Sequence, residues 1–562
     1  MKSSFPVIFL VLFCGLAATP CLARKIPDTE SKSLVLAVAT EPKTFNVMVA
    51  QETTSTEITQ YLFEGLTSLD PRTGQIIPKL AESWERSADG LVWTFHLRAG
   101  VRWSDGTPLT AGDVRFTFEG IIFNSTIPNG ARDIFTLRGS PITVQVKDDA
   151  TVIFRLPEPF APFLFALSQP IVPRHILENS VRDGTFQSVW GLGEDPSRIV
   201  GSGPFRVAKV FPGERIELAR NSHYWRKDAA GRSLPRIDRL LFLIIPSPDN
   251  QLLRFLDGET DVYPVRGVDY PFLKPLETRR NFRIFRTGPS LGSYFIALNQ
   301  QAGTPWKQQW FKDPELRRVL ASGIDRDSMI DIVFNRLAVK QCSPLSPSVP
   351  LYYDPDAGCY DHDPDGARKV LVEKLGFKDT DRDGILEDTA GHPLEFILVT
   401  NSEDPMRLEL AQMVREDWRK LGIKVHVQSL EFNTLVTQLT VTRDWDAVLI
   451  GLTGPVDPHF GANVWLSSGN LHFWNHGAGD PSPFESRVDA LFREASTTLD
   501  LRQRITLYRD WQRLVMRELP LIYTVIPEVV YAVRDRFGPL SPSALGGPFY
   551  PIEELEPWGA AP

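Results

Sequence analysis

The sequence has 562 residues, with 61 Lys and Arg against 69 Asp and Glu and a formal net charge of −8 at pH 7. This acidic balance disfavours nucleic acid as a partner, because nucleic acids select basic protein surfaces. A chain well above about 300 residues exceeds what one hydrophobic core usually supports, so two or more domains are expected.

The N-terminal segment, residues 1–23, has the pattern of a secretory signal peptide. Lys2 supplies a positive charge, an apolar run covers 7–18, and residues 21–23 place small side chains at the −3 and −1 positions of a cleavage site. The run is shorter than the roughly 20 apolar residues of a membrane-spanning helix. We therefore expect export to the periplasm. A lipid anchor on the cell surface is the alternative, although neither cysteine of this segment follows the small residue that such an anchor requires.

Residues 70–110 combine turn signals with short strand-like stretches. The turn dipeptides are Asp70-Pro71, Asp89-Gly90 and Asp105-Gly106. Between them, Val92 to Leu97 is typical of a strand. Thr110 and Asp113 then form a capping-box-like helix start. This part of the chain predicts a small, sheet-rich subdomain.

The glycine-rich run 201–204 leads into strand-like residues, 205–207, and not into a helix. It therefore cannot aim a helix N-terminus at a phosphate group. We predict a turn where the chain crosses between domains.

The clearest local unit is a β-α-β motif at 394–428. A short apolar strand is followed by Asp404-Pro405, which predicts an N-cap and a first-turn proline, and the helix ends at Gly422 before a second alternating strand. Its crossover should be right-handed, which makes the strands parallel. A further apolar strand covers 447–452. Three other helices are predicted to begin after Asp313, Asp363 and Asp500.

Removal of the signal peptide leaves two cysteines, Cys342 and Cys359. In an oxidising compartment such a pair indicates a disulfide. It would close a loop of about 17 residues and stabilise the fold by roughly 3 kcal/mol. Two buried free thiols are the alternative, and no ligand cluster accompanies the pair to suggest a metal.

An acidic turn matches the first half of a calcium loop. Its oxygen ligands at positions 1, 3 and 5 are Asp379, Asp381 and Asp383. The glutamate expected at position 12 is replaced by Ala390, and only Glu387 or Asp388 could compensate. The preferred interpretation is a carboxylate-rich surface turn, and we predict no metal and no cofactor.

Catalytic motifs are missing from the sequence. It contains no Gly-x-Ser-x-Gly elbow, no Walker loop and no His-Glu-x-x-His, and no nucleophile stands at a recognisable spacing from a base. His459, His472 and His476 match no metal-ligand pattern. We therefore disfavour an exported hydrolase.

The segment 451–475 is the best candidate for a binding loop. It begins where the strand 447–452 ends, and ligands of open α/β sheets bind beyond the carboxyl ends of strands. Its glycines allow close approach of the backbone, while its tryptophans and histidines offer flat, partly polar surfaces. A purely structural loop is the alternative.

Several motifs, in their order along nearly the whole mature chain, resemble the oligopeptide- and dipeptide-binding family of ABC-transporter solute-binding proteins, family 5. They include Phe63-Glu64-Gly65-Leu66, Leu80-Ala81-Glu82-Ser83-Trp84, Val101-x-Trp103-x-Asp105-Gly106, Gly201-Ser202-Gly203-Pro204-Phe205, Asn221-x-x-Tyr224-Trp225 and Asp313-x-x-x-Arg317-Arg318.

The resemblance implies an α/β, two-lobed periplasmic-binding-protein fold with a hinge and an inserted subdomain. The implied bounds are lobe I from 24–69, 196–294 and 525–562, the inserted subdomain 70–195, and lobe II 295–524. It also implies a monomer that closes around a small solute, peptide or peptide-like, and hands it to an ABC permease of the inner membrane.

The site residues of the family are only partly matched in this sequence. Peptide binders of the family place an aspartate just after a strand-end Gly-Trp, where it pairs with the amino group of the peptide. Here Gly451-Leu452 stands at that point and the next acid is Asp457, so Asp457 or Glu52 would have to take this role. An oligosaccharide, opine or metallophore, or a sensor or holdase function, is the alternative. The predicted ligand-binding residues are Glu52, Thr53, Thr54, Thr453, Asp457, His459, Trp465 and Trp474.

Overall fold

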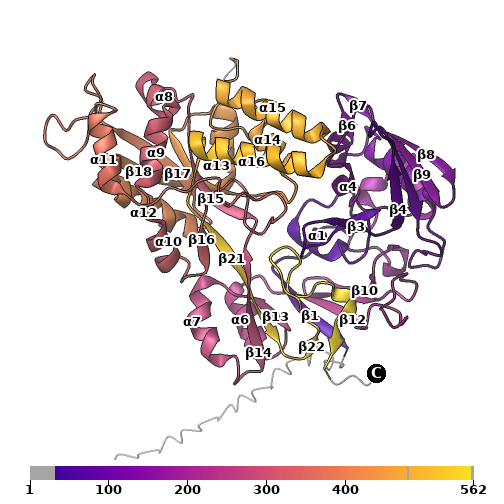
Figure 1. Cartoon of the computed structure of the whole chain (residues 1–562). Coiled ribbons are helices and arrows are strands. Elements are labelled where there is room, and N and C mark those ends of the chain that lie inside the picture. Colours follow the sequence, from indigo (N-terminus) through magenta and orange to yellow (C-terminus); the bar gives the residue numbers. More distant parts are fainter. Residues whose placement is uncertain (1–31, 477–479, 559–562) are drawn as a thin grey trace, which may run out of the picture.

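Two large hydrophobic cores organise this computed structural model, which describes residues 32–476 and 480–558. One core draws its side chains from Phe295 to Val525; the other draws them from Leu34 to Phe242 and from the C-terminal end of the chain. Figure 1 shows them as two lobes side by side. The predicted signal peptide, 1–23, lies outside the described residues. No helix among the described residues is long and apolar enough to cross a membrane.

Lobe I is built on a four-stranded sheet in the order β1-β12-β11-β10. Its strands are β1 (Ser33–Val38), β10 (Phe205–Phe211), β11 (Arg215–Arg220) and β12 (Arg239–Ile244). β1 runs parallel to β12, and the other pairs are antiparallel. The apolar run of β12 is almost wholly buried, as expected of a strand covered on both faces. Other elements of this lobe are α1 (Thr53–Thr59), β2 (Thr67–Leu69), α6 (Pro248–Leu256), α7 (Tyr270–Leu273), β22 (Phe537–Gly538) and β23 (Glu556–Pro557).

A second, antiparallel sheet forms the inserted subdomain, in the order β4-β5-β9-β8. Its strands are β4 (Ala81–Arg86), β5 (Val92–Leu97), β8 (Thr143–Asp148) and β9 (Thr151–Arg155). β5 alternates between buried and partly exposed side chains, which confirms the predicted strand. The capping box of Thr110 and Asp113 is present at the start of α2 (Ala111–Arg115), as predicted. The remaining elements here are β3 (Ile76–Pro78), α3 (Ala131–Ile134), β6 (Thr136–Leu137), β7 (Ser140–Pro141), α4 (Phe163–Ala166) and α5 (Arg174–Arg182).

The sheet of lobe II has the order β18-β17-β19-β15-β20. Its strands are β15 (Gly292–Leu298), β17 (Glu395–Asn401), β18 (Lys424–Leu430), β19 (Ala447–Thr453) and β20 (Leu521–Tyr523). The β-α-β motif is confirmed: β17 and β18 are parallel and are joined by α12 (Pro405–Lys420), which Asp404 caps. Gly422, with φ +88°, ends that connection in a conformation that glycine favours.

Helices cover the sheet of lobe II. They are α8 (Pro305–Lys312), α9 (Pro314–Ser322), α10 (Arg326–Ile332), α11 (Pro364–Glu373), α13 (Phe432–Thr437), α14 (Ala462–Trp465), α15 (Pro483–Thr497) and α16 (Leu501–Glu518). Asp313, Asp363 and Asp500 cap α9, α11 and α16, as predicted, because each carboxylate accepts a free first-turn amide.

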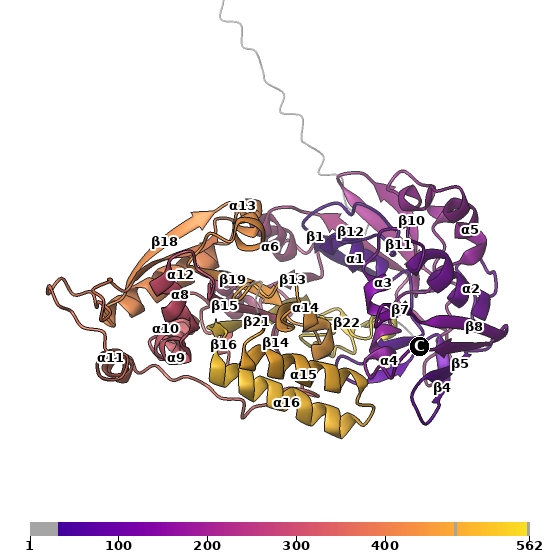
Figure 2. The same cartoon turned by 90° about the horizontal axis from the view of Figure 1, so that it is seen from above.

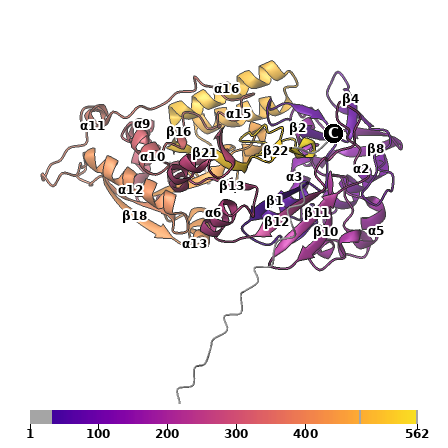
Figure 3. The ribbon, with the colours of Figure 1, turned by 90° about the horizontal axis from the view of Figure 1, so that it is seen from below.

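The chain passes between the lobes at two neighbouring places. It enters lobe II between β14 (Phe282–Pro289) and β15, and returns between β20 and β21 (Val525–Arg534). β21 pairs with β13 (Val262–Pro264) and β14 in lobe I, while its first residues pair with β16 (Ala338–Lys340) of lobe II. Figures 1 and 3 show β21 running between the lobes. The bounds of the lobes and of the inserted subdomain stay a prediction.

The turn at 201–204 packs against the end of α1. Gly203 donates its amide to the Leu62 carbonyl at 2.8 Å, and Phe205 donates to the Tyr61 carbonyl at 3.1 Å. A Cβ on Gly201 would lie 2.0 Å from the Leu62 oxygen. Glycine is therefore required because two backbone segments approach closely here.

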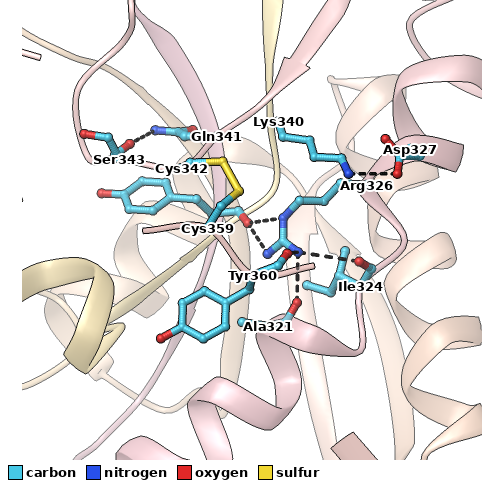
Figure 4. Close-up of a disulfide and its surroundings, with 11 residues drawn as sticks. Ala321, Ile324, Arg326, Asp327, Lys340, Gln341, Cys342, Ser343, Cys359 and Tyr360 are labelled. Atoms are coloured by element: carbon cyan, nitrogen blue, oxygen red, sulfur yellow. Dashed lines mark hydrogen bonds and ion pairs between the residues drawn. A yellow bond between two sulfur atoms is a disulfide. The ribbon is translucent and has the colours of Figure 1, made fainter. Parts of the chain in front are cut away.

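Cys342 and Cys359 form the predicted disulfide, with their Cα atoms 4.6 Å apart. Figure 4 shows it beside the buried Arg326, which donates hydrogen bonds to the carbonyl oxygens of Tyr360 and Tyr523. The disulfide thus closes the loop between Cys342 and Cys359. This loop lies next to the buried guanidinium of Arg326, which donates to backbone carbonyls.

Candidate functional site

The strand-end loop after β19 lies where the sequence predicts a binding loop. Thr453, the last residue of β19, is exposed, and the Gly454 amide donates to the Leu291 carbonyl at 2.8 Å. A Cβ on Gly451 would lie 2.8 Å from the Ser293 carbonyl oxygen. The loop therefore begins directly beside the point at which the chain enters lobe II.

Asp457 is held inside lobe II by an ion pair. Its two carboxylate oxygens lie 2.7 and 2.8 Å from the guanidinium nitrogens of Arg504 on α16, and the two side chains are only 6% and 5% exposed. Burial alone would lower the pKa of Arg504, but the charge of Asp457 raises it. Since this carboxylate already has a cationic partner, the arrangement disfavours the predicted pairing of Asp457 with an amine of a solute.

Trp465 and Trp474 pack in the core of lobe II. They are 6% and 1% exposed, and their rings lie 5.8 Å apart. Trp465 also contacts Trp511 edge to face at 5.0 Å. The structure brings these two predicted residues together, but as core side chains, which disfavours direct contact with a solute in this conformation.

His459 contacts the inserted subdomain across the lobes. Its ring lies 5.2 Å from that of Phe160, and the neighbouring Phe460 lies 5.0 Å from Phe165. The Ala161 amide also donates to the Ser496 carbonyl at the end of α15, at 2.7 Å. Burial lowers the pKa of His459 to about 4, so the ring is neutral at pH 7. We call this set the interlobe contact; Figures 1 and 2 show α15 reaching the subdomain.

The predicted residues of lobe I lie at the start of α1. Glu52 is the N-cap, and its carboxylate accepts the Ser55 amide at 2.8 Å and the Lys43 amide at 2.9 Å. Burial alone would raise the pKa of Glu52, but hydrogen bonds from Ser55 and Lys43 hold it below its usual range. Thr54 is buried and shares a hydrogen bond with Thr40, whereas Thr53 is exposed. Glu52 therefore serves first to cap the helix.

A pocket of about 330 Å³ opens beside α1, between the sheet of lobe I, β21 and the C-terminal loop 544–549. Its polar lining includes Glu57, Tyr61 and Tyr531. Sequence reasoning missed these residues. One local signal was available: Glu57 stands four residues after Thr53, which places both on the same face of a helix.

His472 bonds Glu485 at 2.8 Å inside lobe II. Hydrogen bonds from His472, Asn475 and Ser482 lower the pKa of Glu485 to about 2, although burial alone would raise it.

The acidic turn brings oxygens of Asp379, Asp381, Asp383 and Glu387 within 4.8 Å of one another. Glu387 accepts from Thr380, and the Gly384 amide donates to Asp379. These internal hydrogen bonds hold the turn, while the buried Asp379 Oδ1 has no hydrogen-bond partner among the described residues.

The family model of bacterial extracellular solute-binding proteins, family 5 Middle, matches residues 75–473. A probable ABC transporter-binding protein of Deinococcus radiodurans is 30% identical over 88% of this chain and 86% of that protein. The oligopeptide-binding protein AppA of Bacillus subtilis is 27% identical over 94% of both.

The solved structure of AppA from Bacillus subtilis, in complex with a nonapeptide, is similar to this fold. Its TM-score is 0.69 at 26% identity, covering 93% of this chain and 98% of that one. The two-lobed α/β fold expected from the sequence is thus confirmed. The chain belongs to the bacterial extracellular solute-binding proteins, family 5.

Proposed function

We propose that this protein is the extracytoplasmic binding component of an ABC importer, which captures a peptide or peptide-like solute between its lobes and delivers it to a permease of the inner membrane. The observation that carries the proposal is the crossing of the chain between the lobes at two neighbouring strand connections, β14–β15 and β20–β21. Two adjacent connections allow one lobe to rotate against the other.

Binding follows from a population shift between open and closed forms. A solute can favour closure only if it makes better contacts in the closed form than in the open one. The interlobe contact, centred on His459 and Phe160, stabilises the closed form even without a solute. The solute then contributes the rest from the exposed strand end at Thr453 and from the α1 side of lobe I.

A peptide-like solute is supported by the similarity to the Bacillus subtilis relative, which is an oligopeptide-binding protein. A peptide brings a free amino group, and a buried ammonium needs an acceptor. Because Asp457 is engaged by Arg504, we propose that the amine is recognised elsewhere than in the strand-end loop. Thr53, Thr453 and His459 remain the predicted contacts of the solute.

Native mass spectrometry of the protein purified from its own cell envelope tests the proposal. We expect a co-purified mass that fragments as a short peptide. A glycoside or a metallophore would overturn the solute class while leaving the binding function intact. Recovery of the protein in the cytosolic fraction, with its first 23 residues retained, would contradict the proposed location.

A further inference from the structure

The pocket beside α1, which we call the α1 pocket, combines apolar walls with a small set of oxygen atoms. Leu36 of β1, Phe242 of β12 and the loop 544–549 contribute to its lining. Among the described residues that line it, none is a lysine, arginine or histidine, and Glu57 is the only charged one. These residues therefore give the pocket negative charge.

Four terminal oxygen groups of the α1 pocket make no hydrogen bond or ion pair within the described part of the chain. They are the Glu57 carboxylate, the hydroxyls of Tyr61 and Tyr531, and the side-chain oxygen of Gln60, whose amide nitrogen donates to the Glu57 carbonyl. Glu52, five residues before Glu57, differs because its oxygens are taken up by backbone amides. The α1 pocket therefore presents acceptors that no group of the described residues satisfies.

Glu57, Tyr61 and Tyr531 share one electrostatic environment. Burial, and after it the charge of Glu57, raises the pKa of Tyr61, and the same two causes raise the pKa of Tyr531. Burial together with the charge of Glu52 raises the pKa of Glu57 itself, although the Glu57 side chain is exposed overall. A positive group of a ligand would offset the repulsion between the two glutamates.

We propose that the α1 pocket binds a primary ammonium group of the solute, with Glu57 as its ionic partner and Tyr61 and Tyr531 as further acceptors. An ammonium has three N–H donors, which the Glu57 carboxylate and the two tyrosine hydroxyls can accept, and aromatic rings favour a nearby cation. A volume of about 330 Å³ suits one residue-sized group of a larger molecule. This inference rests on the proposed function, since the solute must enter between the lobes.

The position of Tyr531 connects the α1 pocket to the hinge region. Tyr531 lies on β21, opposite Phe285 of β14 and Pro264 of β13, and the start of the same strand pairs with β16 of lobe II. An ammonium seated here would therefore contact a strand that both lobes share.

The test compares the full-length mature protein with Glu57→Gln and with a control, Glu82→Gln, which changes an exposed glutamate of β4. Isothermal titration at pH 7 uses tetra-alanine, N-acetyl-tetra-alanine and cadaverine. We expect Glu57→Gln to weaken tetra-alanine or cadaverine binding by about 10- to 100-fold, the range for a lost hydrogen bond to a charged group. Glu82→Gln should stay within twofold, and acetylation should weaken tetra-alanine as much as Glu57→Gln does.

The outcomes separate this inference from the proposed function. If tetra-alanine binds and Glu57→Gln leaves its affinity within twofold, the ammonium site is wrong while peptide binding stands. If only cadaverine binds and Glu57→Gln abolishes it, the ammonium site stands and the peptide class fails. Binding of neither amine to the wild-type protein overturns the site. Tyr531→Phe removes the hydroxyl but keeps the ring, and it should weaken amine binding several-fold. This second variant keeps the test valid if Glu57→Gln fails to fold.

Discussion

At the residue scale, the same side-chain type serves opposite purposes according to its partner. Asp457 and Glu57 are both carboxylates near the lobe boundary, yet Asp457 bonds Arg504 in the core while Glu57 lines an open pocket without a partner. The buried charge of Asp457 is tolerated because a partner satisfies it, whereas the exposed carboxylate of Glu57 is left free for a ligand. The partner, more than the residue type, therefore decides which acid can bind a solute.

Asp457→Ala should reduce the free energy of unfolding by about 3–5 kcal/mol, because Arg504 would remain buried without its counter-charge. Urea unfolding followed by tryptophan fluorescence measures this loss. Asp535→Ala is the control, since its ion pair with Arg283 is exposed and should contribute about 0–1 kcal/mol. Unchanged stability with at least tenfold weaker solute binding would instead make Asp457 a ligand residue.

His459 should make stability pH-dependent. Its folded pKa of about 4 lies below the ordinary value of 6.5, so the unfolded chain binds a proton between these values and the folded chain does not. Stability is therefore complete above pH 6.5 and falls by up to about 3 kcal/mol as the pH drops to 4. His459→Leu should flatten this part of the profile in thermal unfolding.

The control for this profile is His96→Gln, because His96 is a half-exposed histidine of β5. It should leave the slope between pH 6.5 and 4 as in the wild-type protein. Equal slopes for His459→Leu and the wild-type protein would show that the protonation of His459 is not linked to folding.

At the scale of elements, the position of α1 depends on the turn at 201–204. This turn bonds the carbonyls of Tyr61 and Leu62, just after α1 ends, and thereby places Tyr61 in the α1 pocket. Local capping by Glu52 fixes the other end of the helix. The helix that carries Thr53 and Glu57 is thus held at both ends by specific backbone contacts.

Gly203→Ala should destabilise the protein by about 1–3 kcal/mol, since its Cβ would lie 2.4 Å from the Tyr61 carbonyl oxygen. It should also weaken solute binding by displacing Tyr61. Gly193→Ala is a matched control, because a Cβ there meets no atom within 4 Å. Denaturant titration of both variants measures the difference in stability. Equal unfolding midpoints for the two variants would show that the turn accommodates the added Cβ without loss of stability.

At the scale of the whole molecule, the proposed closure depends on contacts between distant parts of the chain. The inserted subdomain contributes Phe160 and Phe165, and lobe II contributes His459, Phe460 and the end of α15. If the lobes open and close as we propose, separating them exposes this apolar surface, so these contacts should favour the closed form in the absence of solute.

Phe165→Ala combined with Phe460→Ala should open the unliganded protein. We expect a larger radius of gyration in small-angle X-ray scattering and a several-fold weaker solute affinity, because the solute must then supply more of the closure free energy. Phe272→Ala, at a side chain of α7 that is 55% exposed, is the control. A radius equal to that of the wild-type protein would show that the interlobe contact does not influence closure.

Local elements and the site differed in how far the sequence could predict them. The strand at 92–97, the capped helices after Asp313 and Asp500 and the Cys342–Cys359 disulfide are as expected. The tryptophans at 465 and 474 are not the exposed surfaces that their loop suggested, because the loop folds back onto α16 and the core. Residue type alone does not distinguish a core aromatic side chain from a cleft-lining one.

The sequence by itself determined the periodic segments, their caps and turns, and the family order of motifs, because each of these is encoded by residues a few positions apart. Only the tertiary structure decided which charged side chains have an ion-pair partner and which do not. Asp457 meets Arg504 across 47 positions, and the α1 pocket joins residues as distant as Leu36, Glu57 and Tyr531. Charge satisfaction and pocket shape depend on contacts between remote segments, and such contacts leave no local pattern in the chain.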